Sequence, residues 1–212
     1  MKDENCDVRL GVTKSLYDIF ISSDQALLSS VNNIFGTFQK DNQYKIREKT
    51  IVTISELGVS LGLEVFKNHF ETLFFTYLTD SVWSVREAGI KTLEKLTAKF
   101  GATWTTTSLI PKLLNFLNQP KTSYLQRITV LSSVAACAKS LNQNQVTEFV
   151  IKNLLTYLKD KIPNVRFFLI KTLMTLGPYT DNAGKDKCKN AVKELKNDED
   201  IDVKYFVGKF NM

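Results

Sequence analysis

The sequence is poor in the two residues that make tight turns, with nine Gly and four Pro among 212 residues. An all-β fold of this length needs turns at short intervals, so these counts favour helices. The hydrophobic fraction of 43% and the charged fraction of 24% are those of an ordinary folded domain. We therefore expect an all-α protein.

Side chains for catalysis and metal binding are also scarce. The one histidine, His69, has no Cys, Asp or second His at ligand spacing beside it. No Gly-rich phosphate loop, zinc cluster or Ser-His-Asp set is present. The acidic run 198–202 lacks the Gly and the closing Glu of a calcium loop and is better explained as a turn and helix cap. The sequence predicts no enzyme activity, no cofactor and no metal site.

Signals for secretion or membrane insertion are missing as well. The three cysteines, Cys6, Cys137 and Cys188, are far apart and odd in number, which predicts reduced thiols and a cytoplasmic or nuclear location. No apolar run is long enough to cross a membrane, and the charged residues 1–5 are unlike a secretory signal. The net charge of +6 comes from Lys residues scattered among acids. We interpret it as a solvated surface, with an acidic partner or nucleic acid as the alternative.

One short signature recurs along the chain: an Asp, then a basic residue six positions later that follows Val or Ile. A degenerate copy ends at Arg127 and has Gln119 where an Asp is expected. Successive basic residues are separated by 38, 39, 41, 39 and 38 residues, so a unit of one length is repeated. The complete copies are Asp3/Arg9, Asp41/Arg47, Asp80/Arg86, Asp160/Arg166 and Asp198/Lys204.

Each signature opens a stretch with one apolar stripe. Small or apolar residues fall at offsets 0, 3, 4, 8 and 11 from the Val or Ile, as on one face of an α-helix. A second amphipathic segment precedes each signature, so every repeat is predicted to be a helical hairpin. Gly11 and Gly89 fall on the stripe and are expected where two helices approach closely. Pro111 lies inside a first helix and is expected to bend it.

These hairpins predict one right-handed α-α superhelix (solenoid) that spans residues 1–212. Gly62, Gly101 and Gly177 separate the repeats, as helix terminators do. The repeats are expected at about 1–22 (partial), 24–61, 63–100, 104–141, 144–178 and 182–210.

The Asp and the base of the signature are expected to have a structural role. The Asp can accept hydrogen bonds from the free N–H groups that open the second helix. The base lies in the first turn of that helix, where the helix dipole disfavours a cation, so an acid must hold it. We expect a ladder that joins each base to an Asp of the same or a neighbouring repeat. Its members are Asp3, Arg9, Asp41, Arg47, Asp80, Arg86, Arg127, Asp160, Arg166, Asp198 and Lys204.

Three consecutive turns carry an aromatic residue three positions before the base: Tyr44, Trp83 and Tyr124. Stacked repeats place equivalent residues in a row, so these rings are expected to line one ridge. Tyr and Trp in turns are typical of protein-binding hot spots. The alternative is that each ring packs onto the adjacent repeat.

The Asp-x5-Arg signature at a period near 39 resembles the HEAT repeat. Several stretches also resemble the family of scaffold subunits of protein phosphatase 2A. They follow the order of the last five to six repeats of that family, and the resemblance covers essentially the whole chain. The stretches are 85–88, 93–96, 99–101, Trp104, 110–113, 163–167, 176–178, 181–182 and 200–206.

The resemblance implies a scaffold without catalytic activity whose intra-repeat turns bind the catalytic subunit of protein phosphatase 2A. Regulatory B-type subunits bind the N-terminal repeats of that family, which have no counterpart here. Lys45 stands where family members commonly carry Arg, and the chain is basic where family scaffolds are acidic. We expect either a fragment of a longer scaffold or a short relative. The contact positions implied here are Tyr44, Lys45, Trp83, Ser84, Tyr124, Gln126, Ile162, Pro163 and Asn164.

Two other functions stay open from the residues alone. A HEAT-repeat adaptor can bind a different protein, such as a transport cargo. Some helical-repeat proteins bind nucleic acid through a basic face that carries aromatic residues. In this sequence the Lys residues are not confined to one helix face and the aromatic residues fall in turns, so we favour protein binding.

Overall fold

The computed structural model describes residues 3–22, 25–117, 119 and 122–212. Every regular element in these ranges is a helix, which confirms the all-α class. None of the helices within these ranges is both long and apolar enough to span a membrane. The first two residues of the first predicted repeat, the start of the second at Asp24, and Asn118, Pro120 and Lys121 of the degenerate signature lie outside the described residues.

The chain folds as two compact units, unit 1 (Met1–Phe100) and unit 2 (Gly101–Met212). The boundary falls inside α6 (Trp83–Trp104), where Gly101 has a φ of 83° and leaves helical geometry. Gly62, with a φ of 94°, ends the helix before it in the same way. An L side chain is disfavoured at such φ values, so both glycines terminate helices as expected. Gly177 also follows a helix end, but its φ of −47° is right-handed.

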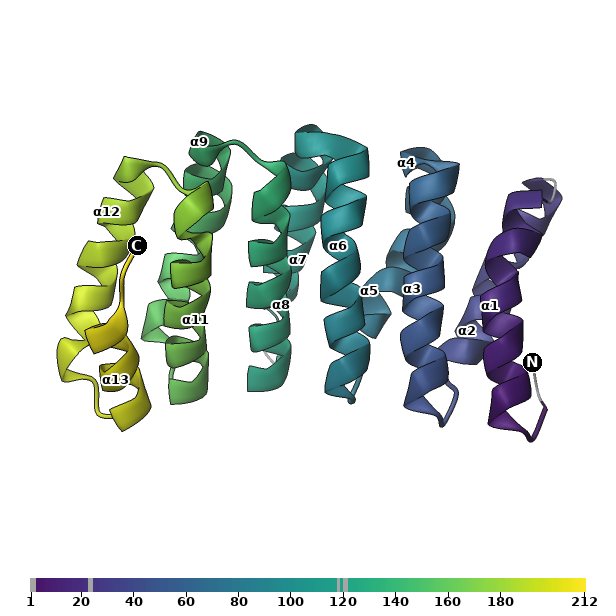
Figure 1. Cartoon of the computed structure of the whole chain (residues 1–212), viewed down its shortest axis with the longest axis horizontal. Helices are drawn as coiled ribbons and strands as arrows, with labels where there is room; N and C mark the ends of the chain where they lie inside the picture. The colour runs from purple at the N-terminus through teal and green to yellow at the C-terminus, as the bar shows by residue number, and fades with distance from the viewer. Residues whose placement is uncertain (1–2, 23–24, 118, 120–121) are drawn as a thin grey trace. The chain divides into compact units, whose positions relative to one another are not determined.

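In unit 1 the helical hairpins form two layers (Figure 1). The second helices of the repeats lie in one layer, where α1 packs against α3. The first helices lie in the other, where α2 packs against α5 and both contact α3. The elements before α6 are α1 (Cys6–Ser22), η1 (Gln25–Ser30), α2 (Val31–Gln39), α3 (Tyr44–Leu61), α4 (Leu63–Val65), η2 (Phe66–Phe70) and α5 (Glu71–Tyr77).

The core of unit 1 is aromatic and lies between these layers. Phe35 stacks on Phe20 at 5.5 Å between ring centroids and meets Phe70 edge-on at 6.1 Å. Phe66 forms a second group of rings with Phe74 and Phe100, at centroid distances of 5.9 and 5.5 Å. Because these rings come from several repeats, each hairpin buries part of its apolar stripe against the neighbouring hairpins.

Unit 2 repeats the same two-layer plan. The second helices α8, α11 and α13 pack side by side in chain order, and α12 packs on η5 and η6 in the first-helix layer. The elements are η3 (Thr105–Leu109), α7 (Ile110–Leu117), α8 (Tyr124–Ala136), η4 (Cys137–Ser140), α9 (Gln143–Gln145), η5 (Val146–Ile151), α10 (Lys152–Leu154), η6 (Leu155–Lys159), α11 (Pro163–Leu176), η7 (Gly177–Tyr179), α12 (Asn182–Lys193), η8 (Glu194–Asn197) and α13 (Ile201–Lys209).

The first helices of three repeats contain a π-helical turn at the same place in the repeat, namely η2, η3 and η5. Pro111 is the second residue of α7, which begins directly after η3, so the α-helical pattern is interrupted just before the proline, near the predicted bend. However, η2 and η5 form without a proline in their repeats' first helices. The widened turn therefore belongs to the repeat and is not caused by Pro111.

The two glycines of the apolar stripe differ in their surroundings. A Cβ at Gly89 would lie 2.7 Å from side-chain atoms of both Ile51 and Leu78, so this glycine permits the close helix approach that we predicted. A Cβ at Gly11 would meet nothing within 4 Å, so that prediction is wrong for Gly11. Gly11 occupies the same position in its repeat as Ala88, which lines an open groove. Gly89 lies one position further along its helix and faces side chains of neighbouring helices.

Candidate protein-binding turns

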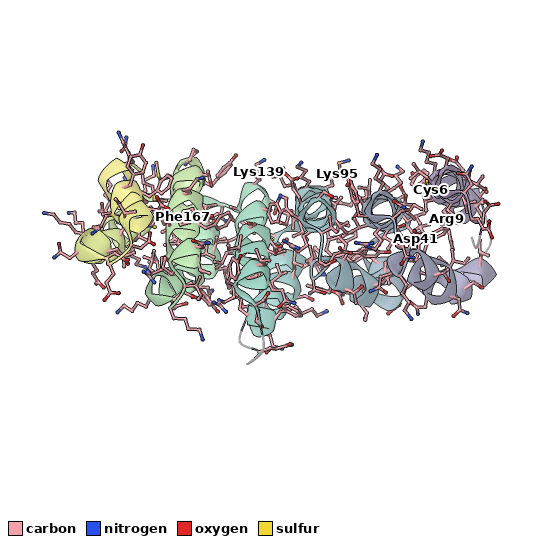
Figure 2. The ribbon with its side chains drawn as sticks, turned by 90° about the horizontal axis from the view of Figure 1, so that it is seen from below. Cys6, Arg9, Asp41, Lys95, Lys139 and Phe167 are labelled. Carbon is pink, nitrogen blue, oxygen red and sulfur yellow. The ribbon has the colours of Figure 1, made fainter. Side chains whose placement is uncertain are left out.

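In unit 1, an Arg side chain and an Asp side chain join each intra-repeat turn to the next turn. Arg9 donates from Nε to Asp41 Oδ2 at 2.7 Å and from a terminal nitrogen to Asp41 Oδ1 at 3.0 Å (Figure 2). Its other terminal nitrogen donates to the carbonyl oxygen of Asp3, in its own turn, at 2.7 Å. One guanidinium therefore donates a hydrogen bond within its own turn and makes a bidentate contact with the Asp of the following repeat.

The next step of unit 1 has the same geometry. Arg47 donates to both carboxylate oxygens of Asp80, at 2.7 and 2.9 Å, and to the carbonyl oxygen of Asp41 at 2.7 Å. Asp80 also accepts the amide N–H of Val82 at 2.9 Å, which satisfies one of the free donors that open α6. In both steps of unit 1 the base therefore reaches the Asp of the following repeat.

Unit 2 contains two further steps. Arg166 donates to Asp198 at 2.8 and 2.6 Å and to the Asp160 carbonyl oxygen at 2.7 Å. Arg127 Nε lies 2.8 Å from Asp160 Oδ2, but its N–H is not directed at that oxygen. The hydrogen bond to Asp160 comes from a terminal nitrogen of Arg127 at 3.1 Å, so this step is an ion pair of looser geometry.

These contacts shift the ionisation of the acids. The Arg9 hydrogen bond lowers the pKa of Asp41 from its usual value, although partial burial opposes the shift. Burial alone would raise the pKa of Asp80, but hydrogen bonds from Arg47 and the Val82 amide outweigh it and the pKa falls. Asp198 behaves in the same way beside Arg166. Asp41, Asp80 and Asp198 are therefore stabilised as carboxylates.

The three turn aromatics lie at the first residue of a second helix and are exposed. Tyr44 begins α3, Trp83 begins α6 and Tyr124 begins α8. Their side chains are 40%, 44% and 40% exposed. Arg86 lies under Trp83, with its guanidinium carbon 5.3 Å from the ring centroid, and donates to the carbonyl oxygen of Ser81 at 3.0 Å. Trp83 is thus supported on one face and open to solvent on the other.

The other residues that we predicted to contact a partner differ in their exposure and in whether they already have a hydrogen-bond partner. Lys45 and Asn164 are exposed, whereas Ile162 and Pro163 are half-buried at the start of α11. The Gln126 side chain accepts the Ser123 amide at 2.8 Å in a capping box, so it already has a structural partner.

Ser84 lies on the wall of a groove between α3 and α6. The groove has a volume of about 260 Å³ and is lined by Glu48, Val52, Glu87 and Lys91, with Ala88, Thr92 and Lys95 further along. Ser84 Oγ is buried and has no hydrogen-bond partner within the described part of the chain. The residues of α3 and α6 that line this groove recur at helical spacing in the sequence, but we did not predict a site at them.

The structure offers no metal-binding cluster within the residues it describes. His69 is half-buried in the π-helical turn η2. Cys137 and Cys188 are buried, and burial raises the pKa of each thiol to about 12. Such thiols are poor nucleophiles, so these side chains are part of the packing.

Hairpins of about 39 residues, two layers of helices and an Asp–Arg ladder through the turns define a HEAT-repeat protein. The sequence model of the family described as PIK3R4-like, middle domain, matches residues 1–178. The chain belongs to this family.

Comparison with curated proteins confirms the resemblance to phosphatase scaffolds. The regulatory A subunit of protein phosphatase PP2A from Saccharomyces cerevisiae is 30% identical over 123 residues, which is 55% of this chain and 19% of that protein. The serine/threonine-protein phosphatase 4 regulatory subunit 1 of Homo sapiens is 26% identical over 216 residues, 95% of this chain and 23% of that protein. The chain therefore spans about a fifth of the length of these relatives. An engineered protein of known structure matches with a TM-score of 0.44 and 9% identity, over 98% of this chain and 90% of its own, which is too loose to bear on the fold.

Proposed function

We propose that this protein is a non-catalytic scaffold that binds the catalytic subunit of a serine/threonine phosphatase through its intra-repeat turns. The support from comparison is that its relatives are named as regulatory subunits of phosphatases PP2A and PP4. These names favour a phosphatase partner and leave the choice between a PP2A-type and a PP4-type catalytic subunit to experiment.

The observation that carries the proposal is the exposure of aromatic residues on rigid turns. Tyr44 and Trp83 in unit 1 and Tyr124 in unit 2 are each about two-fifths exposed. The turns of Tyr44 and Trp83 are fixed by the hydrogen bonds that Asp41 and Asp80 accept from the backbone amides of Gln43 and Val82. A rigid, exposed Tyr or Trp loses little conformational freedom when a partner covers it, which is the property of a binding hot spot.

The direct test is co-elution of the full chain with purified phosphatase catalytic subunits. At micromolar concentrations, size-exclusion chromatography should show a complex with a PP2A-type or a PP4-type subunit. The preferred subunit is then identified by competition. If the chain elutes separately from both phosphatases under these conditions, the proposal is contradicted.

A variant series locates the contact. Trp83→Ala and Tyr124→Ala should each weaken binding by about 2 kcal/mol, roughly thirtyfold in Kd, as hot-spot truncations do. Phe149→Ala is the matched control, because Phe149 is also 40% exposed but lies in η5, in the first-helix layer and away from the turns. If all three variants bind equally well, the turns are not the contact surface.

A further inference from the structure

The residue directly after the ladder base is aromatic in the last two repeats, where it is Phe167 on α11 and Tyr205 on α13. The same position is acidic on α3 and α6, where Glu48 and Glu87 line the groove between these helices. A lysine stands four residues after each of the two aromatic residues, Lys171 on α11 and Lys209 on α13. The helices α11 and α13 therefore each carry an aromatic residue and a lysine one helical turn apart.

These side chains make one connected surface, which we call the α11/α13 patch: Phe167, Lys171, Tyr205, Phe206 and Lys209. Phe167 of α11 (Figure 2) stacks on Phe206 of α13 with a centroid distance of 5.7 Å and an interplanar angle of 15°. Lys171 Nζ lies 5.2 Å from the Phe206 ring centroid, and Lys209 Nζ lies 5.8 Å from that of Tyr205. Tyr205, which is 58% exposed, meets Phe206 edge-on at 5.3 Å between ring centroids, so each of these two neighbouring rings has an exposed ammonium group beside it.

The charge of the surrounding unit has the same sign as the patch. Residues 101–212 contain 16 Lys and Arg against nine Asp and Glu, a net charge of +7. Residues 1–100 contain 12 against 13, a net charge of −1. The excess positive charge of the chain is therefore confined to unit 2. The exposed acid nearest to the patch along α13 is Asp202, which precedes Phe206 by one helical turn and leaves the lysines in excess.

We propose that the α11/α13 patch binds an acidic segment of a partner protein. Carboxylates of that segment would pair with Lys171 and Lys209, and an apolar side chain would pack against the exposed ring of Tyr205. Single-stranded nucleic acid fits less well, because bases stack on free aromatic faces. Here Phe167 and Phe206 stack on each other, and Lys171 and Lys209 lie over the rings of Phe206 and Tyr205.

This surface is separate from the turn aromatics in its own unit. Tyr124 begins α8, whereas the patch lies along α11 and α13. The inference therefore does not rest on a phosphatase partner, and the two can be tested apart. Loss of the turn contact should leave acidic-peptide binding unchanged.

The test is fluorescence anisotropy of the full chain with a labelled peptide of Glu residues around a central Phe. We expect saturable binding with a Kd below about 1 mM, weakening as NaCl rises from about 50 to about 300 mM. The double variant K171E/K209E should bind at least about tenfold more weakly, because two attractive contacts become repulsive. Tyr205→Ala should lower the affinity without changing its salt dependence.

The control is K189E/K193E, which changes the net charge equally but on α12, in the first-helix layer, where both lysines are exposed. It should retain nearly all of the affinity. Circular dichroism and thermal melting establish that every variant is folded. The proposal is overturned if both double variants lose the same affinity for the peptide, or if the natural chain shows no saturable binding. It is also overturned if oligothymidylate displaces the labelled peptide at lower concentrations than unlabelled peptide does.

Discussion

Arg47 and Asp80 join two consecutive repeats through a bidentate contact, with nitrogen–oxygen distances of 2.7 and 2.9 Å. The same guanidinium also donates to the carbonyl oxygen of Asp41 in its own turn. The side chains are only 12% and 9% exposed, so neither charge is well solvated if the other is removed. The pair therefore couples the geometry of one turn to that of the next.

Arg47→Ala should destabilise unit 1, because it leaves the Asp80 carboxylate largely buried without its cation. We expect a loss of about 3 kcal/mol in the free energy of unfolding, measured by urea titration. Lys91→Ala is the control, since Lys91 makes an exposed contact of 3.0 Å with Glu87 and should change stability by less than about 0.5 kcal/mol. Equal effects in the two variants would show that the ladder contributes nothing beyond a surface ion pair.

Acid should unfold the chain through the ladder carboxylates. The pKa values of Asp41 and Asp80 are lower in the folded chain than their usual value, so the unfolded chain binds more protons as the pH falls. Their contribution to stability is complete above the unfolded pKa of about 3.9 and is lost as the pH drops through the lower folded values. The melting temperature should stay level from about pH 7 to about pH 5 and fall below about pH 4. In Asp80→Asn this acid-dependent fall should be smaller, and an unchanged profile would remove Asp80 from the explanation.

The two stripe glycines should respond to alanine in opposite directions. Gly89→Ala places a methyl group 2.7 Å from side-chain atoms of Ile51 and Leu78, and should destabilise by about 1 kcal/mol through overpacking. Gly11→Ala adds its methyl group to open space in a helix, and should stabilise by about 0.5 to 1 kcal/mol. Thermal and urea unfolding of both variants measure the difference, and changes of the same sign would contradict this assignment.

Thiol labelling should separate one cysteine from the other two. Cys6 is exposed, while Cys137 and Cys188 are buried with thiol pKa values raised to about 12. At pH 8, iodoacetamide should modify Cys6 quickly and the buried pair only after denaturation. Peptide mass spectrometry gives the rate for each site. Rapid native labelling of Cys137 would show that its helix opens more readily than the packing implies.

The repeat and its helices could be predicted from the sequence, because the Asp and base recur at a fixed period. The direction of the ladder could not. Spacing alone places an Asp such as Asp41 within reach of the base in its own repeat or in a neighbouring one. Only the structure shows that Arg9 reaches forward to Asp41. Similarly, the sequence marks Gly11 and Gly89 alike, since the apolar stripe does not show which of its edges faces another helix.

The candidate surfaces were predictable to different degrees. The turn position of Tyr44, Trp83 and Tyr124 follows from the repeat, but their exposure depends on packing that only the structure supplies. The α11/α13 patch does not stand out in the sequence, because the lysines are scattered along the whole chain. Their excess in the second half and their recurrence next to aromatic residues become informative only when α11 and α13 lie side by side.

The ladder runs from a base to the Asp of the next repeat, and this direction affects how repeats can be gained or lost in the gene. Arg47 and Asp80 lie 33 positions apart, so the 39 residues from 42 to 80 contain a complete Arg–Asp pair. Deletion or duplication of such a segment in the gene would remove or add both partners together, and Arg9 would keep Asp41. A break between Arg47 and Asp80 would instead separate this base from its acid, and each would then need a new partner from another repeat. The intra-repeat turn is therefore a junction at which a repeat can be removed or added together with its own Arg–Asp pair.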